Sequence, residues 1–392
     1  MTQIALVNPQ GQLSVHTLSG RSIPVVALQP FNRIAYSAAH VVANPRAAID
    51  PWLQSAVDWD ATLRYRHHLW SLGLGVAEAM DTAQRGMGLD WATSRELIQR
   101  TLQAARTVPG ARVASGCGTD HLDPAQVNTL DDVIRAYDEQ IDAIESLGGQ
   151  LIIMASRALV KVARSPADYE KVYDHILSQV RAPVILHWLG HMFDPALAGY
   201  WGHDDLDRAT DTALGVIRAH ASKVDGIKVS LLDQDREIAM RRQLPAGVRM
   251  YTGDDFNYAE LIAGDGVGTQ PVHGHSDALL GIFDAIAPAA SAALSMLAQG
   301  EVARFHDILA PTVPLSRHIF QAPTRFYKTG VVFMAWLNGH QSHFTLVGGQ
   351  HSARSLPHLC ELYRLADEAG LLTDPALSTH RMRQLLALHG IE

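Results

Sequence analysis

Short apolar runs rich in β-branched residues alternate along most of the chain with longer stretches of helical periodicity. The runs are continuous and rarely interrupted by polar residues, which is typical of strands buried on both faces of a parallel sheet. Eight runs separated by helical stretches favour an α/β fold of the (β/α)8 (TIM) barrel type over an open sheet. The predicted strands are Arg33–Ala38, Leu74–Met80, Arg112–Gly116, Gln150–Ala155, Pro183–Trp188, Gly226–Leu231, Val248–Thr252 and Gly266–Val272.

The chain is longer than such a barrel needs, and both ends predict additions to it. Residues 1–30 predict an N-terminal β-hairpin extension with a turn at Pro9–Gly11. Residues 31–287 would form the barrel, and residues 288–392 a C-terminal helical extension packed on it. No Gly/Ser-rich linker separates the last two parts, so we expect them to form one body.

Composition and charge favour a soluble cytoplasmic protein that acts on small molecules. Of 392 residues 47% are hydrophobic, which is enough to bury a large core. The 32 basic and 40 acidic residues give a net charge of −8 with no basic run, which disfavours nucleic acid and membrane surfaces as partners. The two cysteines, Cys117 and Cys360, cannot form a disulfide framework, as expected in a reducing cytoplasm. The sequence shows neither a leader-like start nor an apolar run of membrane-spanning length.

In a barrel of this type, chemistry takes place at the carboxyl ends of the strands. Several predicted strands end in polar or ionisable residues, so we expect a site built from these loops. They include Asp81, Thr82, Asp120, His121, Arg157, His187, Asp254, Asp255, His273 and His275.

Lys228, in the apolar segment DGIKVSLL, is the most unusual residue of the predicted strands. Strand alternation puts Ile227 and Val229 on one face and Lys228 on the other, beside Gly226, which leaves room for it. We expect Lys228 to point into the barrel, where burial lowers the pKa of its amine. A neutral lysine is the nucleophile that forms a Schiff base with a carbonyl compound. The alternatives are an ion pair with a carboxylate such as Asp254, or a side chain that reaches the rim.

The order of segments between residues 33 and 390 resembles the dihydrodipicolinate synthase / N-acetylneuraminate lyase family of class I aldolase barrels, and the chain looks like a divergent branch of it. The specific part is the pair VDGIKVSLLD and RMYTGDD, with RVASGCGTD, APVILHWLG and TRFYKTGVVFMAWLNG as further similar segments. The resemblance implies that Lys228 is the Schiff-base lysine. It also implies a homodimer or a homotetramer.

Two departures from the family pattern bear on the substrate. The segment matching the family's carboxylate-binding loop keeps Thr82 but carries Asp81, which would repel a carboxylate at close range. Ser156-Arg157-Ala158 stands where the family has its proton-relaying tyrosine. His187 is then the best-placed proton relay, although it fits equally well as a hydrogen-bonded rim residue. Arg157 either binds a substrate carboxylate or pairs with Asp81.

The leading hypothesis is a Schiff-base lyase or aldolase of carbohydrate metabolism, acting on a small hydroxylated carbonyl or sugar-derived keto compound and needing no cofactor. Lys228 and His187 would be catalytic, with the pocket shaped by Asp81, Thr82, Arg157, Asp254 and His273.

Two alternatives stay open. One is a metal-dependent hydrolase or sugar isomerase, with a divalent ion held by His121, His187, His273 and His275. The other is a degenerate barrel that only binds its ligand.

Overall fold

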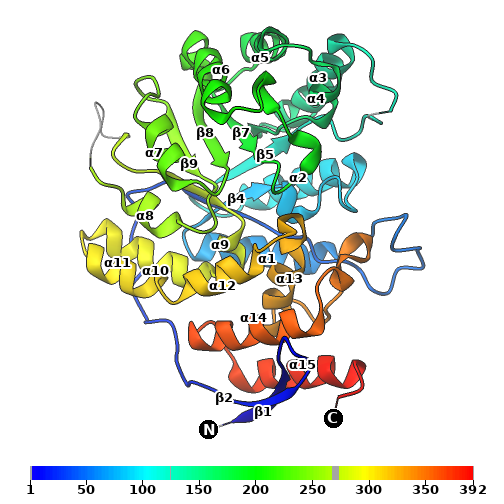
Figure 1. Cartoon of the computed structure of the whole chain (residues 1–392), viewed down its shortest axis with the longest axis vertical. Helices are drawn as coiled ribbons and strands as arrows, with labels where there is room; N and C mark the ends of the chain where they lie inside the picture. The colour runs from blue at the N-terminus through cyan, green and yellow to red at the C-terminus, as the bar shows by residue number, and fades with distance from the viewer. Residues whose placement is uncertain (1, 124, 267–272, 392) are drawn as a thin grey trace.

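Eight parallel strands close into a barrel in a computed structural model that describes residues 2–123, 125–266 and 273–391 (Figure 1). Around the barrel the strand order is β10-β3-β4-β5-β6-β7-β8-β9, so the first and last strands are neighbours. The (β/α)8 fold predicted from the apolar runs is confirmed. The strands are β3 (Ala35–Ala38), β4 (Gly75–Glu78), β5 (Val113–Cys117), β6 (Gln150–Ile153), β7 (Val184–Leu189), β8 (Val224–Ser230), β9 (Arg249–Thr252) and β10 (Asp277–Leu280).

The prediction for the eighth strand was wrong. It named Gly266–Val272, of which residues 267–272 lie outside the described part, and the barrel is closed instead by β10. Both segments are short and apolar, so the pattern alone does not decide between them. The shift matters because it moves His273 and His275 from the end of the last strand to a position before its start.

Helices follow the strands and cover the outside of the barrel (Figure 1). Their starts are fixed by side-chain caps: Thr129 and Asp132 form a capping box at α3, and Ser165 and Asp168 form another at α5. The barrel helices are α1 (Trp59–Ser71), α2 (Trp91–Ala105), α3 (Leu130–Ser146), α4 (Arg157–Val162), α5 (Pro166–Gln179), α6 (Leu206–Ala219), α7 (Gln234–Arg241), α8 (Tyr258–Ala263), α9 (Ile282–Ala285) and α10 (Ala287–Ala298).

Side-chain alternation fills the barrel interior with a small cluster of its own that includes Ala77, Ile152, Ile185 and Tyr251. A side chain on Gly226 would meet the ring of Tyr251 at 2.7 Å, so this face of β8 points inward. Two residues further along the same face, Lys228 therefore points into the barrel, as alternation predicts.

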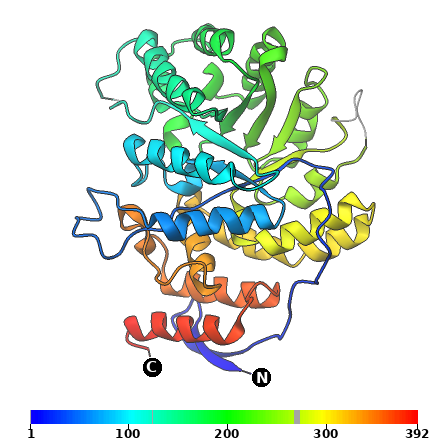
Figure 2. The ribbon, with the colours of Figure 1, turned by 180° about the vertical axis from the view of Figure 1, so that it is seen from behind.

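Two further parts pack below the barrel in Figure 1. The N-terminal hairpin consists of β1 (Gln3–Val7) and β2 (Leu13–Thr17), and an extended segment leads from it to β3 (Figure 2). The C-terminal part is helical, as predicted; the exact domain boundaries at residues 30 and 287 stay predictions. Its helices are α11 (Val302–Leu309), α12 (Thr312–Ile319), α13 (Tyr327–Leu337), α14 (Leu356–Glu368) and α15 (Pro375–Leu388). No helix within the described ranges is both long enough and apolar enough to span a membrane.

Candidate active site

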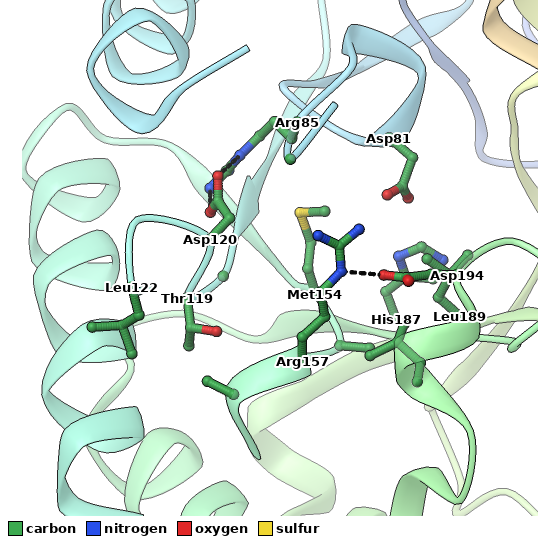
Figure 3. A pocket seen from close by; sticks show the side chains of 15 residues that line it. Asp81, Arg85, Thr119, Asp120, Leu122, Met154, Arg157, His187, Leu189 and Asp194 are labelled. Carbon is green, nitrogen blue, oxygen red and sulfur yellow. Dashed lines mark hydrogen bonds and ion pairs between the residues drawn. The ribbon is translucent and has the colours of Figure 1, made fainter. Parts of the chain in front are cut away.

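A cavity of about 110 Å³ opens at the carboxyl ends of β4 to β7 (Figure 3). Its size is on the scale of the roughly 150 Å³ cavity that accommodates benzene in an engineered protein. Asp81 and His187 lie on one side of it, and Arg85 with Asp120 on the other. The remaining wall is formed by Gly86, Gly118, Thr119, Leu122, Met154, Ala155, Arg157, Ala158, Leu189, Asp194 and Leu197.

Lys228 does not line this cavity itself, but its register partner His187 does. The lysine is 7% exposed, and a side chain on Gly253 would lie 2.8 Å from its Cε, so that glycine makes room for it. Among the described residues its Nζ makes no hydrogen bond and no ion pair. Burial lowers the pKa of this amine, against the opposing influence of Asp81 and Asp255. A buried amine with a lowered pKa is more often neutral, and a neutral amine can act as a nucleophile.

His187 is buried, with its Nε2 3.3 Å from the hydroxyl oxygen of Ser230. Its Nδ1 has no hydrogen-bond partner in the described part of the chain. Burial and the neighbouring Lys228 hold the pKa of the imidazole well below its usual value. The ring is therefore neutral near pH 7 and can accept a proton.

The two aspartates after β9 have different surroundings. The sequence predicted Asp254 as a substrate-binding residue, but Asp255 is the one that lies near Lys228. The carboxylate of Asp254 accepts hydrogen bonds from Phe256 N, Asn257 N and Asn257 Nδ2, so it anchors the loop. Asp255 instead interacts with Lys228, and burial raises its pKa to about 7. Side chains two residues apart in an extended segment share a face. Gly253 faces Lys228, so this rule already favours Asp255 over Asp254 as the residue on the inner side.

The loop after β4 presents Asp81 to the cavity, where its carboxylate faces inward (Figure 3). Ala79 (φ 52°) and Gln84 (φ 68°) on either side adopt left-handed backbone conformations, which are unfavourable for residues with a side chain. Strain of this kind is typical of functional loops. Thr82 is buried, and its hydroxyl lies 2.8 Å from the Tyr327 hydroxyl.

Arg157 lines the cavity and pairs with Asp194, not with Asp81 as one alternative held (Figure 3). Its side chain is 44% exposed, so the guanidinium stays accessible to a ligand. On the opposite wall Arg85 is buried and held by Asp120 and Gln140. Arg157 is thus the more adaptable of the two cavity arginines.

The four histidines of the alternative metal site are not brought together. His273 and His275 precede β10 at the amino end of the barrel, where the carbonyl of His273 accepts a hydrogen bond from Arg241. His275 has its pKa lowered to about 4 by burial and by nearby arginines. His121 contacts Gln140 and Glu139 of α3. Within the described ranges, no three His, Cys, Asp or Glu side chains are arranged to hold a metal ion. The placement of His273 as a substrate-binding residue followed from the misplaced eighth strand.

A family model described as "Protein of unknown function (DUF993)" matches residues 4–391. The chain belongs to this DUF993 family. No curated protein matches the DUF993 chain in sequence.

Solved structures share the fold of the DUF993 chain at low sequence identity. The 4-hydroxy-tetrahydrodipicolinate synthase of Methylacidiphilum fumariolicum SolV is 15% identical, with a TM-score of 0.62 over 89% of this chain and 99% of that one. Dihydrodipicolinate synthase of Aquifex aeolicus is 11% identical, with a TM-score of 0.60 over 92% and 98%. YagE of E. coli K12, a member of the dihydrodipicolinic acid synthase family solved with pyruvate, is 12% identical, with a TM-score of 0.62 over 92% and 99%.

Sequence reasoning missed two residues that α13 brings to the site of the DUF993 chain. Tyr327 is buried against Thr82, and Lys328 is buried with its Nζ hydrogen-bonded to the Arg325 carbonyl. Burial lowers the pKa of Lys328 to about 8, and Asp81 acts against this shift. A polar Tyr-Lys pair at the start of an otherwise apolar helix was the only local signal.

Proposed function

We propose that this protein is a Schiff-base-forming lyase or aldolase that uses Lys228 as its nucleophile. The observation that carries the proposal is the inward-pointing, buried amine of Lys228, which has no ion-pair partner among the described residues. Its lowered pKa favours the neutral form that attacks a carbonyl carbon. The fold shared with dihydrodipicolinate synthases supports the same chemistry by analogy.

In the proposed reaction, the amine of Lys228 forms a C–N bond to the carbonyl carbon, and the carbonyl oxygen leaves as water. One proton of that water comes from the lysine nitrogen and the other from an acid. In a retro-aldol cleavage a base then removes the proton of the substrate's β-hydroxyl, and a new C=O bond forms. The C–C bond breaks, and its electron pair moves into the iminium group to give an enamine. Condensation is the reverse of this sequence, and loss of a β-hydroxyl from the enamine is the dehydration.

We assign the base to His187, because its ring is neutral, lines the cavity and is the register neighbour of Lys228. Asp81 faces the cavity with a carboxylate that accepts hydrogen bonds from hydroxyls and repels a carboxylate. Arg157 lies across from it and is suited to an anionic or polar end of the substrate. These groups favour a small hydroxylated carbonyl or sugar-derived keto compound, with no cofactor required.

Reductive trapping tests this proposal directly. The protein is mixed with borohydride and pyruvate, dihydroxyacetone or glycolaldehyde in turn, and adducts are read by intact mass and assigned by peptide mapping. We expect a single adduct on the peptide that contains Lys228 and none in Lys228→Met. Lys328→Met is the matched control, because it removes the other buried lysine of this region and should keep the adduct on Lys228.

Three results would reject the Schiff-base assignment. One is equal labelling of wild type and Lys228→Met. Another is activity that survives Lys228→Met but is lost with a chelator, which favours the metal-dependent hydrolase or isomerase. The third is the lack of any adduct together with ligand-dependent stabilisation, which favours a binding barrel. Cytoplasmic location and assembly as a homodimer or homotetramer stay predictions, to be tested by fractionation and by light scattering.

A further inference from the structure

Tyr327, the first residue of α13, lies at the carboxyl end of the barrel, where it contacts Thr82 after β4 and Gly281 after β10. A side chain on Gly281, directly after β10, would lie 3.2 Å from the Cε2 of Tyr327, so the glycine makes room for the ring. The ring of Phe320 stacks on that of Tyr327 with ring centroids 4.3 Å apart and an interplanar angle of 16°, and Gly281 makes room for both rings. The ring is therefore fixed between the barrel and the C-terminal helices.

Among the described residues, the hydroxyl of Tyr327 has one hydrogen-bond partner, the hydroxyl of Thr82 after β4, at 2.8 Å. Two carboxylates that act on the hydroxyl, Asp81 and Asp255, are the same two that act on the amine of Lys228. The loop after β9 links the two groups in space: Gly253 leaves room for Cε of Lys228, and Asp255 accepts a hydrogen bond at 2.8 Å from the amide of Ile282, next to the Gly281 that contacts the Tyr327 ring. Burial, with these carboxylates, raises the pKa of Tyr327 well above its usual value, which keeps the phenol protonated near neutral pH.

We propose that Tyr327 is the general acid of imine formation, held by Thr82 and supplied by the C-terminal helices. The inference rests on the proposed function, since it gives a role to a second side chain around the Lys228 amine. The segment after β6, Ser156-Arg157-Ala158, contains no tyrosine. In this proposal Tyr327 of α13 supplies the phenolic hydroxyl instead. The C-terminal extension is then part of the active site and not only a support for the barrel.

The proposed step is balanced in atoms and charge. The carbinolamine on Lys228 holds the former carbonyl oxygen as a hydroxyl, and Tyr327 passes its phenolic proton to that hydroxyl. The C–O bond breaks, water leaves, and the nitrogen lone pair forms the C=N bond of the iminium ion. The phenolate that remains regains a proton from solvent. General acids in such a position typically accelerate a step by about a hundredfold to ten-thousandfold.

The experiment measures the rate at which borohydride traps pyruvate, and separately dihydroxyacetone, on Lys228 in wild type and Tyr327→Phe. The phenylalanine keeps the ring contacts and removes only the hydroxyl, so we expect trapping to slow by about a hundredfold or more. Tyr363→Phe is the matched control: its hydroxyl also bonds a threonine, Thr379 at 2.9 Å, but between α14 and α15. We expect that control to trap at the wild-type rate.

The pH profile of trapping separates an acid from a structural hydroxyl. With Tyr327→Phe, solvent hydronium must protonate the carbinolamine, so over the pH range in which Lys228 is neutral the trapping rate should rise toward tenfold for each unit of falling pH. Wild type should show a flatter profile. Thr82→Ser, which keeps a hydroxyl, should retain most of the rate that Thr82→Val loses. The charged groups facing the phenol are Asp81, Asp255, Asp284 and Lys328, whose Nζ lies 4.7 Å from the ring centroid.

Each outcome decides between the two proposals. Equal trapping rates and equal pH profiles in wild type and Tyr327→Phe overturn the role of Tyr327 and leave the Schiff base intact. The absence of any Lys228 adduct in wild type overturns the proposed function, and this inference with it. Slower trapping in Tyr327→Phe with an unchanged pH profile assigns the hydroxyl to structure and rejects the acid.

Discussion

The two ends of the barrel differ in how completely their buried polar side chains are paired. At the amino end, Tyr251 donates to Asp225 at 2.6 Å, and Tyr36 donates to Gln150 at 3.3 Å. Asp277 accepts from the backbone of Ile34 and pairs with Arg249 at 3.0 Å. We call the side chains joined by these bonds the amino-end network: Tyr36, Gln150, Asp225, Arg249, Tyr251 and Asp277.

At the carboxyl end, Arg85, Arg157 and Asp254 are also paired, but three buried groups around the barrel axis stay unpaired or weakly paired. Lys228 has no partner among the described residues, and neither does Nδ1 of His187. Burial raises the pKa of Asp255 to about 7, so this carboxylate loses much of its charge just below neutrality. Burying an unpaired polar group costs free energy of folding. Groups of this kind are therefore found mainly at functional sites. The comparison teaches that the polar groups of the amino-end network are all paired, whereas the carboxyl end combines paired groups with the unpaired ones suited to chemistry.

The largest expected effect belongs to Lys228→Met. Loss of the nucleophile should lower activity by about a thousandfold or more, equal to about 4 kcal/mol of activation free energy. The free energy of unfolding should not fall, because methionine fills the site without a buried amine to desolvate. Activity assays and urea unfolding measure the two quantities, with the exposed Lys171→Met as control. A large loss of stability in Lys228→Met would show that the amine is structural.

Asp277→Ala should have the reverse profile. It leaves the Ile34 amide and the Arg249 guanidinium without their shared acceptor, which should lower the free energy of unfolding by about 2–3 kcal/mol. Adduct formation on Lys228 should be unchanged, since Asp277 lies at the opposite end of the barrel. Urea unfolding and borohydride trapping test this, with the exposed Asp211→Ala as control. Loss of trapping without loss of stability would contradict the division between the two ends.

The sequence was sufficient for the barrel and for Lys228 because both depend on local periodicity. Continuous apolar runs mark parallel strands, and alternation with Gly226 fixes the face of Lys228. The sequence did not locate β10, because two short apolar segments fit the eighth strand equally well. It also did not distinguish Asp254 from its neighbour Asp255, because the two residues are of the same type. Tyr327 lies 245 residues from its partner Thr82, and no local pattern reports a contact of that range.

Glu237 is hydrogen-bonded both to the end of β9 and to the residue before β10. We expect it to make the free energy of unfolding depend measurably on pH. This buried side chain of α7 accepts hydrogen bonds from Thr252 at the end of β9 and Ser276 before β10. Burial raises the pKa of Glu237 from 4.5 to about 8. Between pH 4.5 and pH 8 the carboxyl group is therefore protonated in the folded state and ionised in the unfolded state. Stability is then full below about pH 4.5 and falls as pH rises to about 8, by at most roughly 1.4 kcal/mol per pH unit.

Glu237→Gln has no such proton, so urea unfolding of this variant should lose that part of the slope. Unfolding curves at pH 5, 6, 7 and 8 on wild type and variant provide the comparison. If both proteins show the same slope, the carboxyl of Glu237 is ionised in the folded state and its pKa is not raised.

The smallest effect is expected from Tyr36→Phe, and it gives the most direct test of whether the two ends are independent. The hydrogen bond that is lost is long and its acceptor Gln150 is partly exposed to water, so the cost should be about 0.5–1 kcal/mol. In the double variant Tyr36→Phe/Lys228→Met, the two changes in unfolding free energy should add within about 0.5 kcal/mol if the ends do not interact. A larger coupling would mean that the inner cluster between them, with Ala77, Ile152 and Ile185, transmits strain from one end to the other. The amino-end network would then contribute to the environment of the Lys228 amine, and the division of the barrel into a stable end and a reactive end would be wrong.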